Sequence, residues 1–328
     1  MPKSPAPPRR PKRPEIPPAL TVAGIDIDTV GPDSLQEGDS DLVPAWDPDY
    51  ILEPDVMEPL VLAANLDVPI MLVGPMGAGK TTSIEALAAL IGQPCLRITF
   101  NGDVRAADLV GSKEVFQTDQ GPYTEWQDGL IPRALDRQWW VILDEYDACP
   151  SKITFVLQSL LEPGHPLTLT RGNKIMRAPS GSRFRIFATS NTVGGGEETG
   201  LFTGTVQINK SHLSRFAGVR VGYMAREREE IVLQGKFPQA NPAMIKKVVS
   251  VAVEVRNAFG IGSCSVPIAL RQTILWVRAA ERLIQGCSFQ PITAYQRGLA
   301  FAVGSLMDPR DRQFVQGVAQ RVFGGPGW

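Results

Sequence analysis

Histidine and cysteine are scarce in this chain of 328 residues, which holds two His and four Cys. The cysteines lie far apart and form no C-x-x-C pair: Cys95, Cys149, Cys264 and Cys287. With only His165 and His212 available as imidazole ligands, a structural zinc site is not expected. The thiols are those of a reducing compartment rather than of a disulfide framework.

Long apolar runs are also missing. No stretch approaches the roughly 18 consecutive apolar residues of a membrane-spanning helix. The first twenty residues are too rich in proline and polar side chains for a secretory signal, so we expect a cytoplasmic protein without membrane contact. Residues 1–20 are interpreted as a disordered, basic, proline-rich tail, and the sequence does not settle its role.

Lysine and arginine are absent from residues 14–79, a stretch that accumulates thirteen Asp and Glu. The formal net charge of the whole chain is −1. Outside residues 3–13 the chain has no concentrated basic face, which argues against a nucleic-acid partner without excluding one. We expect the acidic lead segment, residues 21–52, to be irregular and to pack on the rest of the chain or on a neighbouring subunit.

Alternating strand and helix patterns predict an α/β nucleotide-binding domain at residues 53–223. Its parallel sheet is expected to have five strands, at 69–73, 95–100, 139–143, 184–189 and 219–223. Residues 167–177 predict an inserted β-hairpin. Strand signals fade beyond residue 224, where five helices predict a small all-helical domain at 224–328; they are expected at 226–235, 242–258, 267–285, 290–305 and 309–323.

Residues 74–81 read Gly-Pro-Met-Gly-Ala-Gly-Lys-Thr, between the first strand and a helix, and match the pattern G-x-x-x-x-G-K-[ST]. Such a loop cradles phosphate with its backbone N–H groups and the positive end of the helix. Lys80 would reach the terminal phosphates, and the Thr81 hydroxyl would bind Mg²⁺. The alternative is a flexible turn with a solvated lysine. The expected nucleotide contacts here are Gly74, Pro75, Met76, Gly77, Ala78, Gly79, Lys80, Thr81 and Thr82.

A pair of carboxylates, Asp144 and Glu145, follows the apolar third strand, 64 residues after Lys80. In ATP-hydrolysing proteins with such a loop, the first acid holds Mg²⁺ through water and the second polarises the attacking water. Asn191, at the tip of the fourth strand, suits the role of orienting that water. The alternatives are that the acids cap the following helix and that Asn191 caps a loop. The sequence does not decide between ATP and GTP.

The motifs together resemble an AAA+ ATPase, because the loop, the acidic pair, Asn191 and Arg215 occur in this order with a helical domain behind them. Residues 108–111 and 128–135 resemble the MoxR branch. More narrowly, the chain resembles the CobS-type ATPase subunit of aerobic cobaltochelatase. The stretches that carry this narrower resemblance are 24–26, 43–44, 49–50, 144–147, 188–194, 199–205 and 207–209.

The resemblance implies a P-loop AAA+ core, a helical lid and a ring of subunits, most often a hexamer, that remodels a protein client or serves chelatase subunits. It makes Arg215 a finger that acts on the neighbouring subunit's nucleotide, and Arg271 the lid arginine that contacts the γ-phosphate. Without the resemblance, Arg215 would be interpreted as a charged residue on the protein surface. The chain departs from the family pattern at Ser214, before the finger, and at Ala269 and Leu270, before the lid arginine.

Other functions stay open at this point. One is a generic MoxR-like chaperone with a von Willebrand-type partner. Another is a nucleic-acid motor, and a third is a scaffold that binds nucleotide with little turnover. Aromatic residues in the insertion at 101–130, Phe116, Tyr123 and Trp126, are candidate partner contacts, or they simply pack the insertion.

Overall fold

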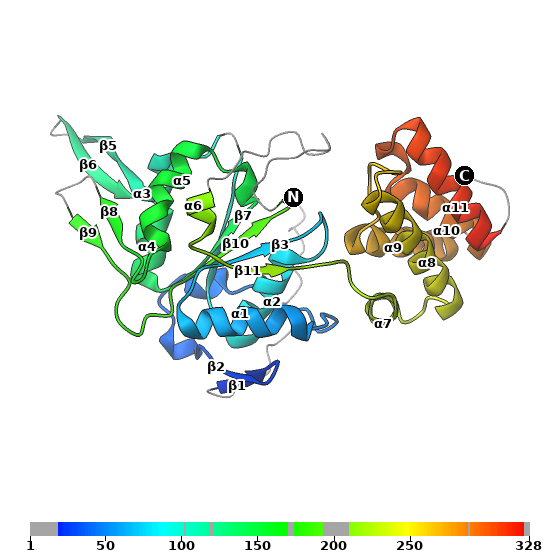
Figure 1. The fold of residues 1–328 in the computed structure, drawn as a ribbon, viewed down its shortest axis with the longest axis horizontal. Coiled ribbons are helices and arrows are strands. Elements are labelled where there is room, and N and C mark those ends of the chain that lie inside the picture. The colour runs from blue at the N-terminus through cyan, green and yellow to red at the C-terminus, as the bar shows by residue number, and fades with distance from the viewer. Residues whose placement is uncertain are drawn as a thin grey trace, which may run out of the picture.

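The computed structural model describes residues 19–101, 103–118, 121–169, 174–192, 210–287 and 289–324. Five parallel strands form the central sheet, in the order β11-β3-β10-β7-β4. This confirms the predicted α/β class and the parallel five-stranded sheet (Figure 1). The strands are β3 (Ile70–Val73), β4 (Cys95–Thr99), β7 (Trp140–Asp144), β10 (Arg185–Ser190) and β11 (Ala217–Arg220).

Helices cover both faces of this sheet (Figure 1). One face packs on α1 (Pro54–Leu66) and α2 (Lys80–Ile91). The other packs on α3 (Ala106–Val110), α4 (Leu130–Arg137), α5 (Ser151–Gln158) and the 3-10 turn η4 (Ser159–Leu161). Because β7 has neighbours and helices on every side, all five of its residues are buried, as the unbroken apolar run predicts.

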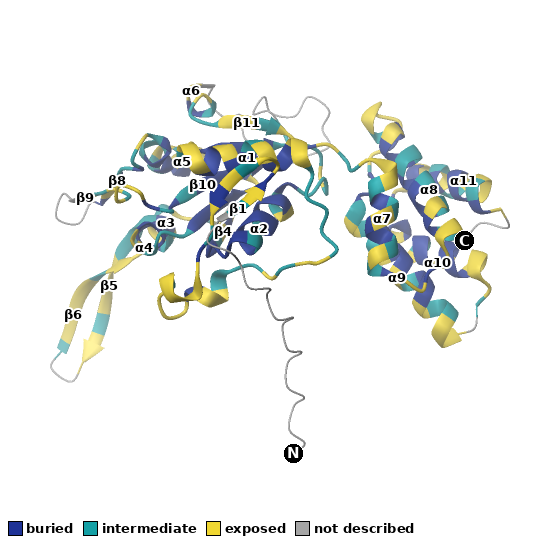
Figure 2. Ribbon diagram, turned by 90° about the horizontal axis from the view of Figure 1, so that it is seen from below, coloured by how far each residue is buried: buried dark blue, intermediate teal, exposed yellow. Residues whose placement is uncertain are grey.

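Two antiparallel hairpins extend from the helical layer beside α3, α4 and α5 (Figures 1 and 2). The shorter pairs β8 (Leu167–Leu169) with β9 (Lys174–Met176), where a hairpin is predicted. The longer pairs β5 (Gly111–Thr118) with β6 (Gly121–Asp128). Here the sequence predicts only an insertion. Its strands escape detection because they are largely exposed and lack the apolar alternation of a half-buried strand.

The lead segment is more regular than its composition predicts. It begins with a hairpin of β1 (Ala19–Val22) and β2 (Ile25–Asp28), so the predicted tail 1–20 overlaps β1 by two residues. Residues 1–18 lie outside the described residues. Two 3-10 turns follow, η1 (Pro32–Ser34) and η2 (Asp39–Leu42). Val22 and Ile27 belong to the apolar cluster of α1 and α2, so the segment packs on the core of the same chain.

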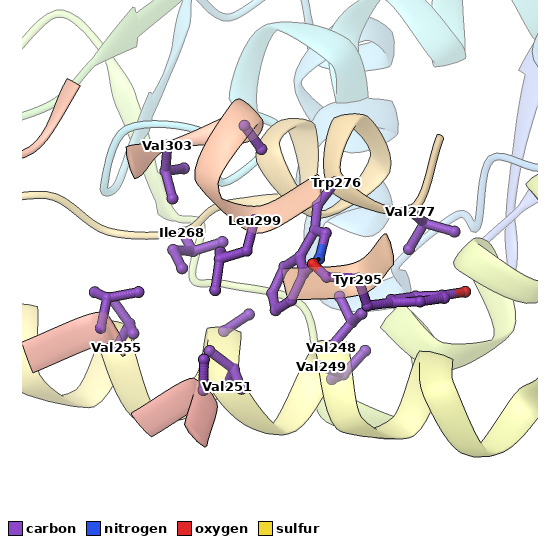
Figure 3. Close-up of a cluster of buried hydrophobic side chains, with 14 of the residues drawn as sticks. Val248, Val249, Val251, Val255, Ile268, Trp276, Val277, Tyr295, Leu299 and Val303 are labelled. Atoms are coloured by element: carbon purple, nitrogen blue, oxygen red, sulfur yellow. Dashed lines mark hydrogen bonds between the residues drawn. The ribbon is translucent and has the colours of Figure 1, made fainter. Parts of the chain in front are cut away.

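The C-terminal part is helical, as predicted, and stands beside the sheet domain (Figure 1). Its helices are α7 (Arg226–Lys236), α8 (Pro242–Gly260), α9 (Leu270–Cys287), α10 (Pro291–Ala302) and α11 (Pro309–Phe323), with η5 (Gly304–Leu306). Trp276 and Tyr295 lie at the centre of its apolar core (Figure 3). The indole N–H of Trp276 donates to the Tyr295 carbonyl over 2.6 Å, so this buried polar group is satisfied.

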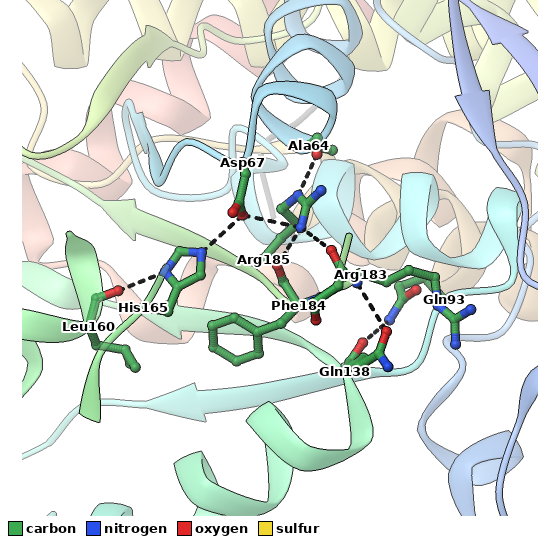
Figure 4. A network of polar contacts seen from close by, with 10 residues as sticks. Ala64, Asp67, Gln93, Gln138, Leu160, His165, Arg183, Phe184 and Arg185 are labelled. Atoms are coloured by element: carbon green, nitrogen blue, oxygen red, sulfur yellow. Dashed lines mark hydrogen bonds and ion pairs between the residues drawn. The ribbon is translucent and has the colours of Figure 1, made fainter. Parts of the chain in front are cut away.

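A partly buried polar network fastens β10 to α1 and to the turn before β8 (Figure 4). His165 contacts the Leu160 carbonyl through Nδ1, at 2.7 Å, and Asp67 through Nε2, at 2.9 Å. Arg185 lies 3.1 Å from the same Asp67 carboxylate and donates to the Ala64 carbonyl. Burial favours the neutral form of Asp67, but its bonds and charges with His165 and Arg185 outweigh this, and its pKa is lowered.

The Asp67→Asn variant is expected to lose roughly 1 kcal/mol of unfolding free energy at neutral pH, a modest value because water screens the half-exposed side chain. The lowered pKa means that the contribution is present above the unfolded value, about 4, and disappears as the pH falls through the folded value. Urea denaturation between pH 3 and 7 measures this, with exposed Asp136→Asn as the control. An equal pH dependence in both variants would contradict the assignment.

Candidate functional site

Three neighbouring strands bring the predicted site residues to one edge of the sheet. In the parallel register, Val73 of β3 lies beside Ser190 of β10, and Leu143 of β7 lies beside Ala188. The carboxyl ends of all three strands therefore meet, and the loop 74–79, the acidic pair and Asn191 follow directly from them. Ligand sites in open parallel sheets lie at this edge.

Lys80 begins α2 and turns back into its own loop. Its ammonium donates to the carbonyls of Gly74, at 2.8 Å, and Pro75, at 3.0 Å, and to Oδ1 of Asn191, at 2.8 Å. Burial lowers the pKa of Lys80 to about 8, against the opposing charges of nearby carboxylates. The ammonium is thus charged at neutral pH, and its ligands are carbonyl oxygens that an incoming phosphate would replace.

Asp144 ends β7 and is surrounded by donors. The hydroxyls of Thr81 and Thr189 each donate to Oδ1 over 2.6 Å, and Arg97 donates to Oδ2 from Nε at 2.9 Å and from Nη2 at 2.5 Å. Burial opposes the charge, but the bonds from Thr189, Thr81 and Arg97 outweigh it and hold the pKa of Asp144 below its usual range. A carboxylate and a hydroxyl in contact form an oxygen donor set suited to Mg²⁺.

Glu145 and Asn191 flank this pair. Glu145 has a left-handed backbone, with φ 55°, and its N–H donates to the Thr189 hydroxyl over 3.1 Å while its side chain is exposed. The N–H of Asn191 donates to the buried carboxylate of Asp147 over 2.9 Å. This bond to Asp147 fixes the backbone of Asn191, and the side-chain amide oxygen of Asn191 accepts the bond from Lys80.

A cavity of about 630 Å³ adjoins the loop. Several parts of the chain line it: the loop and the start of α2, the lead segment from Asp47 to Glu53 with the start of α1, the segment that follows β11, and the helical domain. Tyr50, Ile51, Val221 and Ile274 supply apolar surface, so the cavity suits a flat apolar group beside a phosphate cradle.

The helical domain closes this cavity from the other side. Arg271, near the start of α9, is exposed and lines the cavity, where the sequence predicts a nucleotide contact. Ala269 packs against Gly77, since a Cβ at Gly77 would lie 2.3 Å from the Cβ of Ala269. The Tyr223 hydroxyl donates to the Met76 carbonyl over 3.3 Å, and its ring lies 4.9 Å from the guanidinium of Arg256.

Arg215 is the predicted residue that the structure does not bring to this site. It follows the short helix α6 (Lys210–Leu213) and does not line the cavity. Its Nε donates to Glu162 over 2.6 Å and its Nη1 to the Ser211 carbonyl over 2.5 Å. The stretches 193–209 and 170–173 lie outside the described residues, including most of the motifs at 188–194, 199–205 and 207–209.

Four site residues escaped the sequence-based assignment. Arg97 lies on an edge strand and gives no motif of its own, and Asp147 belongs to the quoted stretch 144–147 without a role. Tyr50 belongs to the stretch 49–50 without a role, although its hydroxyl donates to Ser83 over 2.9 Å, and Tyr223 is predicted only as the last residue of a strand. The signal that would have found Asp147 is that it is a third carboxylate, in the turn directly after the predicted pair Asp144 and Glu145.

Comparison with known proteins decides the family. A family model described as AAA domain (dynein-related subfamily) matches residues 69–205. Aerobic cobaltochelatase subunit CobS from Sinorhizobium sp is 34% identical, over 79% of this chain and 79% of that protein. The chain is an AAA+ ATPase. Protein CbbQ from Hydrogenophilus thermoluteolus is 30% identical, over 84% of this chain and 96% of that protein.

Protein NorQ from Paracoccus denitrificans is 32% identical, over 44% of this chain and 51% of that protein. With CobS and CbbQ, this relative assigns the AAA+ ATPase to the MoxR branch and confirms the resemblance expected from its motifs. Among the described residues, no helix combines the length and the apolar character that crossing a bilayer requires.

The Gly77→Ala variant is expected to weaken nucleotide binding by tenfold or more, because the new methyl group would overpack against Ala269 and displace the loop or the lid, at a cost of about 1–3 kcal/mol. Gly262→Ala is the control: its φ, 71°, is close to the 76° of Gly77, but open space surrounds it. Titration with a fluorescent nucleotide measures both. Equal affinities would contradict the packing of the lid on the loop.

Proposed function

We propose that this AAA+ ATPase is the Mg²⁺-dependent motor of a hexameric ring that couples ATP hydrolysis to the remodelling of a partner protein. The observation that carries the proposal is the convergence of Lys80, Asp144 and Asn191 at the ends of three adjacent strands, with Thr81 bonded to Asp144. Phosphoryl transfer needs positioning and charge stabilisation of this kind. The assignment of domains at 53–223 and 224–328 belongs to the same proposal.

Each residue of the site has a role in this proposal. Lys80 and the backbone N–H groups of the loop bind the phosphates, and Arg271 contacts them from the lid. Asp144 and Thr81 would hold Mg²⁺, which neutralises charge on the phosphates when bound. Glu145, exposed beside them, accepts the proton of the attacking water, and Asn191 orients that water.

The proposed ring follows from the position of Arg215. Its guanidinium is half-buried and paired with Glu162, outside the cavity of its own chain. Developing negative charge on the transferred phosphoryl group calls for a cation beyond Lys80, and an arginine from a neighbouring subunit supplies roughly 10³–10⁵ in rate. A site completed by the next subunit makes hydrolysis depend on assembly.

The partner is proposed to be a protein, and the similarity to CobS points to the subunits of a metal chelatase. The long hairpin β5–β6 offers the contact surface: Val115 is 64% exposed, Tyr123 is 47% exposed, and the Phe116 and Tyr123 rings stack at 5.5 Å. Exposed apolar and aromatic side chains on a projecting element favour a protein partner.

Glu145→Gln is expected to bind ATP with unchanged affinity and to hydrolyse it at least 10²-fold more slowly, because the amide cannot take the proton of the attacking water. Arg215→Ala is expected to keep nucleotide binding and lose at least 10³-fold in turnover. Equilibrium binding and steady-state phosphate release measure the two effects. Wild-type turnover in both variants would contradict the mechanism. Unchanged turnover per subunit in a sample that native mass measurement shows to be monomeric would contradict the shared site.

Partner identity is tested by affinity isolation from the native source with Glu145→Gln and ATP, a state that accumulates the nucleotide-bound form. Recovery of a large chelatase subunit and a von Willebrand-type protein supports the chelatase role. Recovery of the second protein without the first indicates a generic MoxR-like remodeller. The control is Lys80→Ala, which is expected to bind no nucleotide and to retain neither protein.

A further inference from the structure

The residue after the catalytic glutamate joins two parts of the machinery. Tyr146 lies in the 3-10 turn η3 (Tyr146–Ala148), is completely buried, and its hydroxyl is hydrogen-bonded to Nε2 of His212. His212 is 4% exposed and belongs to α6, three residues before Arg215. The loop that carries Glu145 is therefore bonded directly to the turn that carries the finger.

The contact is more than one hydrogen bond. The rings of Tyr146 and His212 stack, with centroids 5.7 Å apart and an interplanar angle of 14°. Phe216, the residue after the finger, packs edge-on against Tyr146 at 5.6 Å, and Phe100 does the same from β4's end at 5.7 Å. Arg215 is thus framed by two residues, His212 and Phe216, that both rest on Tyr146.

The protonation states of Tyr146 and His212 determine the direction of the hydrogen bond between them. Burial, with a smaller contribution from the charge of Arg215, lowers the pKa of His212 to about 4, so its ring is neutral at physiological pH. Burial raises the pKa of the Tyr146 hydroxyl, which stays protonated. The tyrosine therefore donates and the imidazole nitrogen accepts. Both groups are buried, so loss of either leaves its partner unsatisfied.

The position of Arg215 depends on the contacts that hold α6 and the residues after it. α6 has four residues, far fewer than a helix needs to be stable by itself, so its position is set by tertiary contacts. Among the described residues, Tyr146 bonds to His212 and Glu162 holds Arg215 at Nε, Leu213 and Phe216 pack on the core, and the Ala217 N–H donates to the Pro69 carbonyl where β11 begins. A displacement of the loop that carries Glu145 would move the Tyr146 contact, which is the one of these contacts that comes directly from that loop.

We infer that Tyr146 and His212 are positioning residues that couple the catalytic loop of one subunit to the arginine finger this subunit gives to its neighbour. The inference rests on the proposed shared site. Through this pair, the state of one nucleotide site sets the geometry of the finger in the next site. The coupling acts in trans, which distinguishes it from support of Glu145 in the same subunit.

A mixed ring isolates this effect. Acceptor subunits carry Arg215→Ala, so they keep an intact site and lack the finger; donor subunits carry Glu145→Gln, so they keep the finger and lack their own hydrolysis. Each alone is expected to be nearly inactive, and their mixture is expected to regain ATP hydrolysis at acceptor sites. Failure of the mixture to regain activity would overturn the shared site, and with it this inference.

The deciding measurement adds Tyr146→Phe to the donor alone. Its ring stacking is kept and the hydroxyl is lost, so turnover of the mixed ring is expected to fall roughly tenfold, with the nucleotide affinity of the acceptor sites unchanged. His212→Phe in the donor is expected to give the same loss, and the two changes together no additional loss, since they break one contact. Native mass measurement confirms that the mixed ring assembles.

The matched control is Tyr295→Phe in the donor, which removes another buried tyrosine hydroxyl, bonded to Glu281 in the helical domain at 2.8 Å, and is expected to leave turnover unchanged. If the mixture regains activity but Tyr146→Phe in the donor does not lower it, the inference is overturned while the shared site stands. Equal losses from Tyr146→Phe and Tyr295→Phe would also overturn it, because a general loss of stability would then explain both.

Discussion

The site depends on keeping one buried carboxylate charged. Asp144 is 2% exposed, and an isolated carboxylate at that depth would take up a proton. The donors that prevent this come from three other strands or their ends: Arg97 from β4, Thr189 from β10, and Thr81 from the helix after β3. The charge of Asp144 is therefore a consequence of the order of the strands, and the register of the sheet is a requirement of the proposed chemistry.

The acidic lead segment adds ion pairs to the contacts that connect the helical domain with the sheet domain. Asp47 pairs with Lys236 at 2.7 Å, Glu53 pairs with Arg228, and at the other end Asp39 pairs with Arg137 at 3.1 Å. Partly exposed pairs of this kind contribute about 0–1 kcal/mol each. These pairs therefore add little to the packing of Ala269 on Gly77 and to the bond from Tyr223 to Met76. Part of the uneven charge of the sequence is thus used in contacts within one chain.

The sequence predicts those features that depend on residues close together along the chain, and it does not predict those that depend on residues far apart. Five strands, the helical domain and the positions of Lys80, Asp144 and Asn191 follow from short patterns of apolar and turn residues. The hairpin β5–β6 and the lead hairpin do not, since their strands are short or exposed and carry no clear period. Arg97 is missed for another reason: its partner, Asp144, is 47 residues away and meets it only across paired strands.

The short segment after β7 connects the candidate site with two other parts of the chain. Glu145, Tyr146 and Asp147 are consecutive, and their side chains point to different surroundings. Glu145 is exposed, Tyr146 bonds to His212 near Arg215, and Asp147 accepts from the N–H of Asn191. The left-handed backbone at Glu145 and the 3-10 turn that follows send these side chains in different directions. Since the segment is short and two of its side chains are buried in bonds, a shift at Glu145 has few ways to be absorbed locally. The bonds of Tyr146 and Asp147 lead from this segment to the turn with Arg215 and to Asn191, which are the proposed finger and the proposed water-orienting residue.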